Sequence, residues 1–493
     1  MKNINTFFKH FLGGSPVWYK QVMLGFLVIN PVVLFFLGPG YTGWLILFQF
    51  IFILMMALKC YPLLPGGLLA IEVVALGLTS PHEVYHEVEN NLQVILLLLF
   101  MVAGIYFMKD LLTYIFTKIL IAIKSKVLLS LVFALMGAVL SAWLDALTVT
   151  AVMIAVVTTF YRIYNATSIE ERVPGTKSIP EKRVVARDDL ENFNGFLRNL
   201  LMHGVIGTAL GGVATMVGEP QNLLIASEMG WSFADFFIKM ANVTIPVIFF
   251  GLLTTAYIEF HSISGYGYKL PAQVRKILDQ NAREMEEKMS GYKKWGIIMQ
   301  AICAIWLIAA LAFHLAEVGF IGLSVIVILS ATMGVQSEHS IGEAFKEGTP
   351  FLSLLIIFFV IVAMIEHNHL FDPIIAEARS YQGMGQTYFF FIASASLSVI
   401  SDNVFVASVY IKQAVEMLAG DKSQLEDVAM AINIGTNIPS IATPNGQAAL
   451  LFLLTNNIAI RISLSYFRMM KMALPYFIVL TMIALLFLDV KWL

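Results

Sequence analysis

Long apolar runs, separated by short clusters of charged residues, constrain the fold of this chain more than any other feature. In a helix, a run of roughly 20 apolar residues matches the thickness of a bilayer's hydrocarbon core. Charged residues make up only 13% of the chain, about half of their share in soluble domains. The net charge of −2, without a long basic patch, disfavours nucleic-acid binding. We therefore predict an all-α polytopic membrane protein, with candidate spans at 21–37, 42–58, 63–79, 92–117, 200–226, 243–260, 295–313, 318–334, 350–366, 429–458 and 472–488.

Lysine and arginine in the connecting segments predict the orientation of these spans, because such residues concentrate on the cytoplasmic side. Both flanks of 127–161 are basic, which favours a re-entrant hairpin or a tight pair of helices over a single crossing. The stretch 382–411 fits a second hairpin, entering from the outside, and one long span is the alternative for it. The prediction is about 11 spans and two hairpins, with a cytoplasmic N-terminus and a periplasmic C-terminus. The segments placed in the cytoplasm are the N-terminus, 118–126, 162–199, 269–294 and 461–471.

Two blocks of the chain have the same order of predicted elements: two spans, a hairpin and two further spans. An odd number of crossings separates the blocks, so they form inverted repeats, as in many secondary transporters. A polar, helix-breaking string interrupts a later span of each block, at 217–222 and at 442–447. The predicted parts are N-terminal helices 1–62, a first repeat 63–260, a cytoplasmic linker with an extra span 261–317, and a second repeat 318–493.

Each hairpin contains one acidic residue near its turn, Asp145 in the first and Asp402 in the second, and no lysine or arginine. A carboxylate at the bilayer centre costs about 2.5–3.5 kcal/mol, so a proton or a cation is needed to neutralise it. Hard cations such as Na⁺ prefer oxygen ligands. A site that accepts either H⁺ or Na⁺, and alternates between the two sides, exchanges one for the other.

Other side chains in and near the broken helices are weaker candidates for the ion or proton site, because each could instead satisfy broken backbone. They are Thr148, Glu219, Asn222, Ser401, Asn403, Thr443 and Asn445. Weaker still are two further acids, Glu72 and Glu366, and two histidines, His203 and His261. No resident cofactor is expected.

The string from His82 to His86 fits the H-E-x-x-H pattern of zinc hydrolases. It lies in a short outer loop, however, where Ser80 and Glu83 also fit a helix capping box. An intramembrane metallohydrolase is therefore kept only as a remote alternative.

Four strings resemble the NhaB-type sodium/proton antiporters of bacterial inner membranes, within the wider ion-transporter superfamily, and the similarity covers nearly the whole chain. The resemblance implies a transporter rather than an enzyme. It implies electrogenic export of Na⁺, and of Li⁺, against entering protons by alternating access, and a homodimer. Dicarboxylate carriers of the superfamily bear Ser-Asn-Thr at both hairpin tips, which this chain lacks. A Na⁺-coupled anion symporter or a metalloid exporter of the same superfamily remains the alternative. The four strings are 57–72, 101–109, 144–148 and 442–447.

Overall fold

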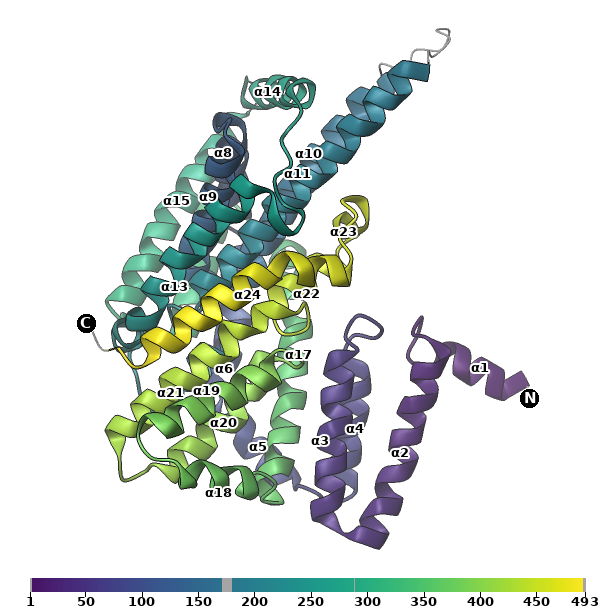
Figure 1. The fold of residues 1–493 in the computed structure, drawn as a ribbon, viewed down its shortest axis with the longest axis vertical. Helices are drawn as coiled ribbons and strands as arrows, with labels where there is room; N and C mark the ends of the chain where they lie inside the picture. Colours follow the sequence, from purple (N-terminus) through teal and green to yellow (C-terminus); the bar gives the residue numbers. More distant parts are fainter. Residues whose placement is uncertain (1, 171–179, 288, 491–493) are drawn as a thin grey trace.

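The computed structural model describes residues 2–170, 180–287 and 289–490, and these residues form helices and loops without a β-strand (Figure 1). The predicted all-α architecture is confirmed. The first half contains α1 (Lys2–His10), α2 (Val17–Leu37), α3 (Pro39–Met55), α4 (Leu63–Ala75), α5 (Pro81–Asn90), α6 (Leu92–Leu96), α7 (Val102–Tyr106), α8 (Lys109–Ala122), α9 (Lys126–Trp143), α10 (Ala146–Glu170), α11 (Pro180–Gly212), α12 (Pro220–Met229) and α13 (Phe233–His261). The second half contains α14 (Ala272–Glu287), α15 (Gly291–Ala312), α16 (Val318–Met333), α17 (Glu338–His367), α18 (Asp372–Ser380), α19 (Met384–Ser398), α20 (Asn403–Met417), α21 (Lys422–Asn437), α22 (Ala448–Thr455), α23 (Asn457–Arg461) and α24 (Tyr466–Leu488).

Seven helices among the described residues are long and apolar enough to cross a bilayer. Three shorter apolar helices, α3, α4 and α16, accompany them. The chain is therefore a polytopic membrane protein. The seven candidate spans are Val17–Leu37, Lys126–Trp143, Ala146–Tyr164, Phe233–His261, Gly291–Ala312, Gly348–His367 and Tyr466–Leu488.

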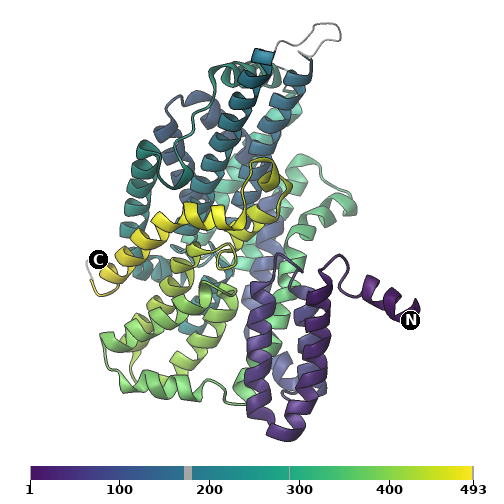
Figure 2. The same ribbon diagram turned by 45° about the vertical axis from the view of Figure 1, so that its right-hand side comes forward.

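The segment 162–199, predicted as a connecting loop, is helical in the part that the structure describes, so the prediction of a loop is wrong there. Residues up to Glu170 continue α10, and residues from Pro180 onward already belong to α11. These two helices run side by side beyond the rest of the bundle (Figures 1 and 2). A helix that extends out of the membrane is as rich in charged residues as a loop. Composition alone therefore could not distinguish the two, which explains the error. The remainder, 171–179, lies outside the described residues.

Three other predicted spans are interrupted. The apolar stretch 92–117 divides into α6, a π-helical turn, α7 and α8 rather than one continuous helix. The stretch 200–226 breaks between α11 and α12, where the polar string 217–222 predicts a break. In the second half, α21 and α22 are separated at 442–447 in the same way. Within the predicted linker 261–317 the structure has the helices α14 and α15.

Small residues allow the central helices to approach closely, as is typical of helix pairs in membranes. A Cβ at Gly207 of α11 would overlap the backbone of Ala134 in α9. In the second half, a Cβ at Gly435 of α21 would lie 2.7 Å from the carbonyl oxygen of Phe391 in α19. The N-terminal helices α2, α3 and α4 lie together to one side, next to α17 (Figures 1 and 2).

Candidate functional site

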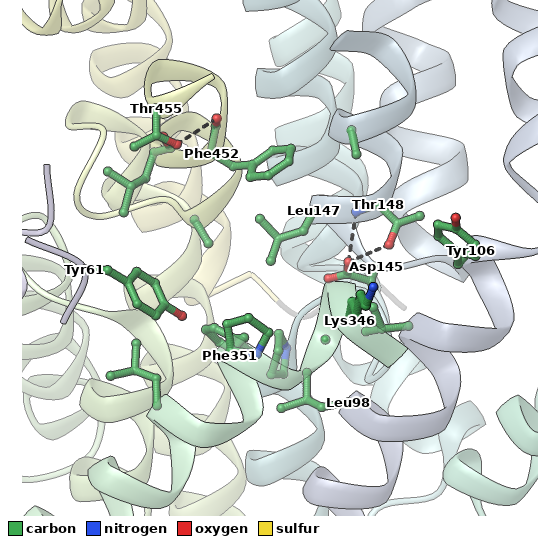
Figure 3. A pocket seen from close by; sticks show the side chains of 18 of the residues that line it. Tyr61, Leu98, Tyr106, Asp145, Leu147, Thr148, Lys346, Phe351, Phe452 and Thr455 are labelled. Carbon is green, nitrogen blue, oxygen red and sulfur yellow. Dashed lines mark hydrogen bonds between the residues drawn. The ribbon is translucent and has the colours of Figure 1, made fainter. Parts of the chain in front are cut away.

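Asp145 lies at the sharp turn between α9 and α10. Leu144 is extended, which ends α9, and α10 begins directly after the aspartate. The Thr148 backbone N–H donates to Asp145 Oδ2 at 2.9 Å, and the Thr148 hydroxyl donates to the same oxygen at 3.1 Å (Figure 3). The carboxylate therefore caps the first turn of α10, whose positive dipole end favours a negative charge. Asp145 is only 6% exposed.

Asp402 occupies the corresponding turn between α19 and α20. Its Oδ1 accepts hydrogen bonds from the backbone N–H of Val404 at 2.8 Å and of Phe405 at 3.4 Å. Both aspartates thus serve as the cap of the second helix of a hairpin, and capping accounts for part of each carboxylate's stabilisation. Capping uses one oxygen of each carboxylate.

The two broken helices are joined to the two hairpins by matching hydrogen bonds. The Thr215 hydroxyl donates to the carbonyl oxygen of Ala142 at 2.5 Å, and the Thr443 hydroxyl donates to the carbonyl oxygen of Val399 at 2.5 Å. Ala142 and Val399 hold the same position relative to the aspartate of their own hairpin. In each half, this hydrogen bond, which we call the threonine tie, therefore holds the break against its hairpin turn.

A pair of glycines repeats this correspondence. A Cβ at Gly218 would lie 2.7 Å from the carbonyl oxygen of Ser141, and one at Gly446 would lie 2.5 Å from that of Ser398. These serines also hold equivalent positions ahead of Asp145 and Asp402. Only glycine permits this approach of backbone to backbone in either half.

The next residue after each glycine is Glu219 in the first half and Gln447 in the second. Both are extended and directly precede the helix that follows the break, α12 or α22. Glu219 and Gln447 therefore hold equivalent positions in the two halves, with a carboxylate in the first and an amide in the second. Gln447 is not among the predicted site residues, although it lies inside the string 442–447.

A small cavity of about 20 Å³ lies where the two hairpin turns and the two breaks meet. Its volume is enough for one water-sized guest. Several polar atoms around it are buried without a hydrogen-bond partner among the described residues, namely Glu219 Oε1, Asn403 Oδ1 and both amide atoms of Gln447. Glu219 is 4% exposed and Gln447 is fully buried. The polar side chains lining this small cavity are those of Asp145, Glu219, Gln221, Asp402, Asn403 and Gln447.

Orphaned polar atoms of this kind are rare in folded proteins, and each calls for an explanation such as an ion or water. Three carboxylates converge here from three different turns, together with three amides. Like charges so confined cannot all remain ionised without protons or cations. The arrangement suits a small positive guest with oxygen ligands.

A large cavity of about 820 Å³ leads to the same region. Asp145, Thr148 and Asp402 line it, and Lys109 and Lys346 line it as well. Figure 3 shows Asp145 and Tyr61 on facing walls of this large cavity. The two aspartates therefore border both cavities, whereas Glu219 lines only the small one.

Two asparagines that the sequence singles out are engaged elsewhere. Asn222 is fully buried and its amide donates to the carbonyl oxygens of Gly212 and Thr215, both at 2.7 Å. It thus satisfies backbone freed by the break in the first half. Asn445 lines the large cavity, where its amide donates to the carbonyl oxygen of Met55 at 2.7 Å.

The remaining candidates are distributed more widely. Ser401 has a buried hydroxyl without a partner among the described residues, but it lines neither cavity. Glu72 accepts a hydrogen bond from Asn30 at 2.7 Å, well away from the hairpins in sequence. His203 lies between Glu259, at 3.1 Å, and the Tyr476 hydroxyl, at 2.6 Å, in a separate buried group. His261 lies at the end of α13, against the ring of Tyr257.

The H-E-x-x-H string forms the start of α5. The capping box predicted from Ser80 and Glu83 is present, with the Ser80 backbone N–H donating to Glu83 at 2.8 Å. Glu83 also contacts His367 Nδ1 at 2.8 Å. The described residues contain no group of three or more His, Cys, Asp or Glu that could hold a metal ion. Glu83 therefore has a structural role in the described structure.

A partly buried ion-pair cluster lies at the far end of α20 from Asp402. Lys412 contacts Glu87 of α5 at 2.5 Å and Glu366 of α17 at 3.2 Å. The side chains of Lys412 and Glu87 are 12% and 6% exposed. Lys346 and Glu366 are separated by about 30 Å along the axis of α17, because a helix rises 1.5 Å per residue. The outer ion-pair cluster, formed by Lys412, Glu87 and Glu366, is thus far from the lysine end of the large cavity.

Comparisons with known proteins agree on one family. Residues 1–493 match the family described as bacterial Na⁺/H⁺ antiporter B (NhaB). A protein named Na⁺/H⁺ antiporter NhaB from Marinobacter nauticus is 55% identical over 484 residues, covering 97% of each chain. Relatives of the same name are 54% identical in Photobacterium profundum, covering 98% of this chain and 92% of theirs, and 53% identical in Serratia proteamaculans, covering 97% and 93%.

Proposed function

The chain belongs to the bacterial Na⁺/H⁺ antiporter B family, and we propose that it exchanges Na⁺ for H⁺ at the small cavity between the two hairpin turns. It is a transporter rather than an enzyme. The observation that carries the site assignment is the convergence of Asp145, Glu219 and Asp402 on one space large enough for a single small guest.

The same ligands can bind either of two competing guests. When ionised, the three carboxylates offer oxygen ligands to Na⁺, and the amide oxygens of Asn403 and Gln447 supplement them. When Na⁺ is absent, protons must neutralise the acids, since buried like charges repel one another. Binding of Na⁺ therefore requires release of H⁺, and the reverse. Exchange follows when the small cavity opens to one side at a time.

Access in this structure is from the side of Lys109 and Lys346. We assign that side to the cytoplasm, because basic residues concentrate there. The outer ion-pair cluster ties α20 to α5 and α17 on the opposite side. We therefore infer that this is a cytoplasm-open state. If α20 moves relative to α5 and α17 during exchange, these ion pairs must separate before the outer side opens.

The matching threonine ties of Thr215 and Thr443, and the matching glycines Gly218 and Gly446, support two repeats within the parts 63–260 and 318–493. We infer that the repeats are inverted, with the hairpins at 127–161 and 382–411 and about 11 spans in all. The family further favours export of Na⁺ and Li⁺, a homodimer in the bacterial inner membrane, a cytoplasmic N-terminus and a periplasmic C-terminus. Acids at both hairpin tips disfavour the alternative of an anion carrier.

Everted membrane vesicles loaded with a pH-sensitive dye test the assignment. Na⁺ added outside should alkalinise the lumen with the parent protein, and Asp145→Asn, Asp402→Asn and Glu219→Gln should each abolish most of this response. Glu72→Gln is the matched control, because Glu72 is an acid of the apolar helix α4 and lines neither cavity. Normal exchange by Asp145→Asn would refute the site. A His82→Ala, His86→Ala double variant should retain activity.

A further inference from the structure

A second polar pocket, of about 330 Å³, lies apart from both cavities of the ion pathway. It is formed by α11, the segment that follows α13, and the segment leading into α24. We call it the arginine pocket. Its polar lining consists of Glu191, Asn194, Arg198, Tyr268, Ser463 and Arg468.

Arg198 is the unusual member of the arginine pocket. It is only 6% exposed, although a guanidinium group carries a permanent charge. Its Nη1 donates to the carbonyl oxygen of Ile462 at 2.8 Å, and its guanidinium lies 5.4 Å from the ring centre of Tyr268. Its Nε has no acceptor among the described residues. A buried charge that is incompletely paired is costly, so an anionic group placed near this Nε would stabilise the side chain.

Arg468, in the first turn of α24, supplies a second guanidinium to the lining of the arginine pocket. Its Nη1 donates to the carbonyl oxygen of Ser463 at 2.7 Å, and the residue is otherwise exposed. Glu191 is the one acid among the lining residues, against two arginines. The lining therefore carries an excess positive charge, and it combines a buried fixed cation with an accessible one.

We propose that the arginine pocket binds a phosphate group. The planar fork of arginine matches phosphate oxygens in a bidentate manner, and two arginines lining one space provide more donors than a carboxylate needs. Arg461 and Lys471 lie close by in sequence, on the side assigned to the cytoplasm. Both an anionic lipid headgroup of that leaflet and free phosphate present this chemistry. The bound group joins α11, in the first half of the chain, to α24, in the second.

The test uses the full-length protein, purified in detergent. It is titrated with short-chain phosphatidylglycerol, with phosphatidylcholine of the same chain length, and with potassium phosphate against potassium chloride at equal ionic strength. Potassium salts avoid the transported Na⁺. The thermal unfolding midpoint reports binding, and native mass spectrometry counts bound lipid.

Arg468→Gln removes the accessible guanidinium, and Arg461→Gln is the matched control. Arg461 is a nearby exposed arginine that contacts the Tyr161 ring and does not line the arginine pocket. We expect Arg468→Gln to weaken phosphatidylglycerol binding about tenfold, which corresponds to ~1.4 kcal/mol. Arg461→Gln should bind like the parent. Arg198→Lys, which keeps the buried charge but loses the fork, should also bind more weakly.

The lipid and phosphate titrations distinguish the two sources of the phosphate group. Stabilisation by phosphatidylglycerol alone identifies a lipid site, and equal stabilisation by potassium phosphate identifies a free-anion site. Both outcomes support the proposal if Arg468→Gln removes the effect. Parent-like binding by Arg468→Gln, or an equal loss in Arg461→Gln, would overturn it, because the attraction would then be diffuse. Equal effects of phosphatidylglycerol and phosphatidylcholine, without any effect of phosphate, would overturn it as well.

Discussion

Removing Lys412 should destabilise the cytoplasm-open state of the transporter. In Lys412→Met, Glu87 keeps its buried position, with a side chain only 6% exposed, but loses its cation. Removal of one partner from a buried ion pair typically costs about 3–5 kcal/mol. We take the lower end, about 3 kcal/mol, because Glu366 is 34% exposed and water screens its share.

A difference of about 3 kcal/mol changes an equilibrium roughly 100-fold. If the outer ion-pair cluster holds the outer side closed, Lys412→Met shifts the population away from the cytoplasm-open state by up to this factor. Everted vesicles expose the cytoplasmic face to the medium, so the apparent KM for Na⁺ added outside should rise markedly. Because the cost arises from an unpaired carboxylate, adding Glu87→Gln to Lys412→Met should recover most of the affinity.

Lys239→Met is the matched control, since the same substitution breaks a different ion pair. Lys239 contacts Glu426 at 2.7 Å, with side chains 29% and 26% exposed. A more exposed pair of this kind contributes about 0–1 kcal/mol, so the apparent KM should change little. An unchanged KM in Lys412→Met, or an equal rise in Lys239→Met, would refute a gating role for the outer ion-pair cluster.

Two further predictions concern the break in the second half and the mouth of the large cavity. Gly446→Ala should lower the thermal unfolding midpoint strongly, because its Cβ would lie 2.5 Å from the backbone oxygen of Ser398 and overpacking costs at least about 1–3 kcal/mol. Gly420→Ala, with no atom within 4 Å of the new Cβ, should leave the midpoint unchanged, and similar midpoints for both variants would contradict this reasoning. Lys346, which donates to the Glu343 carboxylate, lowers the pKa of that exposed group. Because the pKa of Glu343 is lowered in the folded state, its ionised form stabilises the fold at pH values above its ordinary pKa. This stabilisation is lost as the pH falls through the pKa of the folded state. The small stability difference between Lys346→Met and the parent should therefore disappear in acid, and a difference that persists there would be inconsistent with the ion pair.

The parts of the site that depend on local sequence could be predicted. Asp145 and Asp402 stand out because each is the lone acid of an apolar hairpin, and glycine and proline mark both breaks. The structure brings both aspartates, Glu219 and Asn403 to one small cavity. Neighbouring residues within each string determine these features, and long-range contacts are not needed to recognise them.

The parts that depend on packing between distant segments could not be predicted. Gln447 gains its position from the threonine tie of Thr443 to Val399, across a break and a hairpin, and its own sequence carries no sign of this. Asn222 has the right chemistry for an ion ligand, yet its amide nitrogen donates to the backbone carbonyl oxygens of Gly212 and Thr215. Which partner an amide finds is decided by tertiary structure.

Binding of Na⁺ to the purified protein, measured together with the protons released, tests the central claim most directly. The account predicts that Na⁺ binding releases protons. It predicts that Asp145→Asn and Glu219→Gln each weaken Na⁺ binding and reduce the proton release, and that Glu72→Gln changes neither. Parent-like Na⁺ affinity with undiminished proton release in both Asp145→Asn and Glu219→Gln would contradict the assignment of the small cavity as the exchange site.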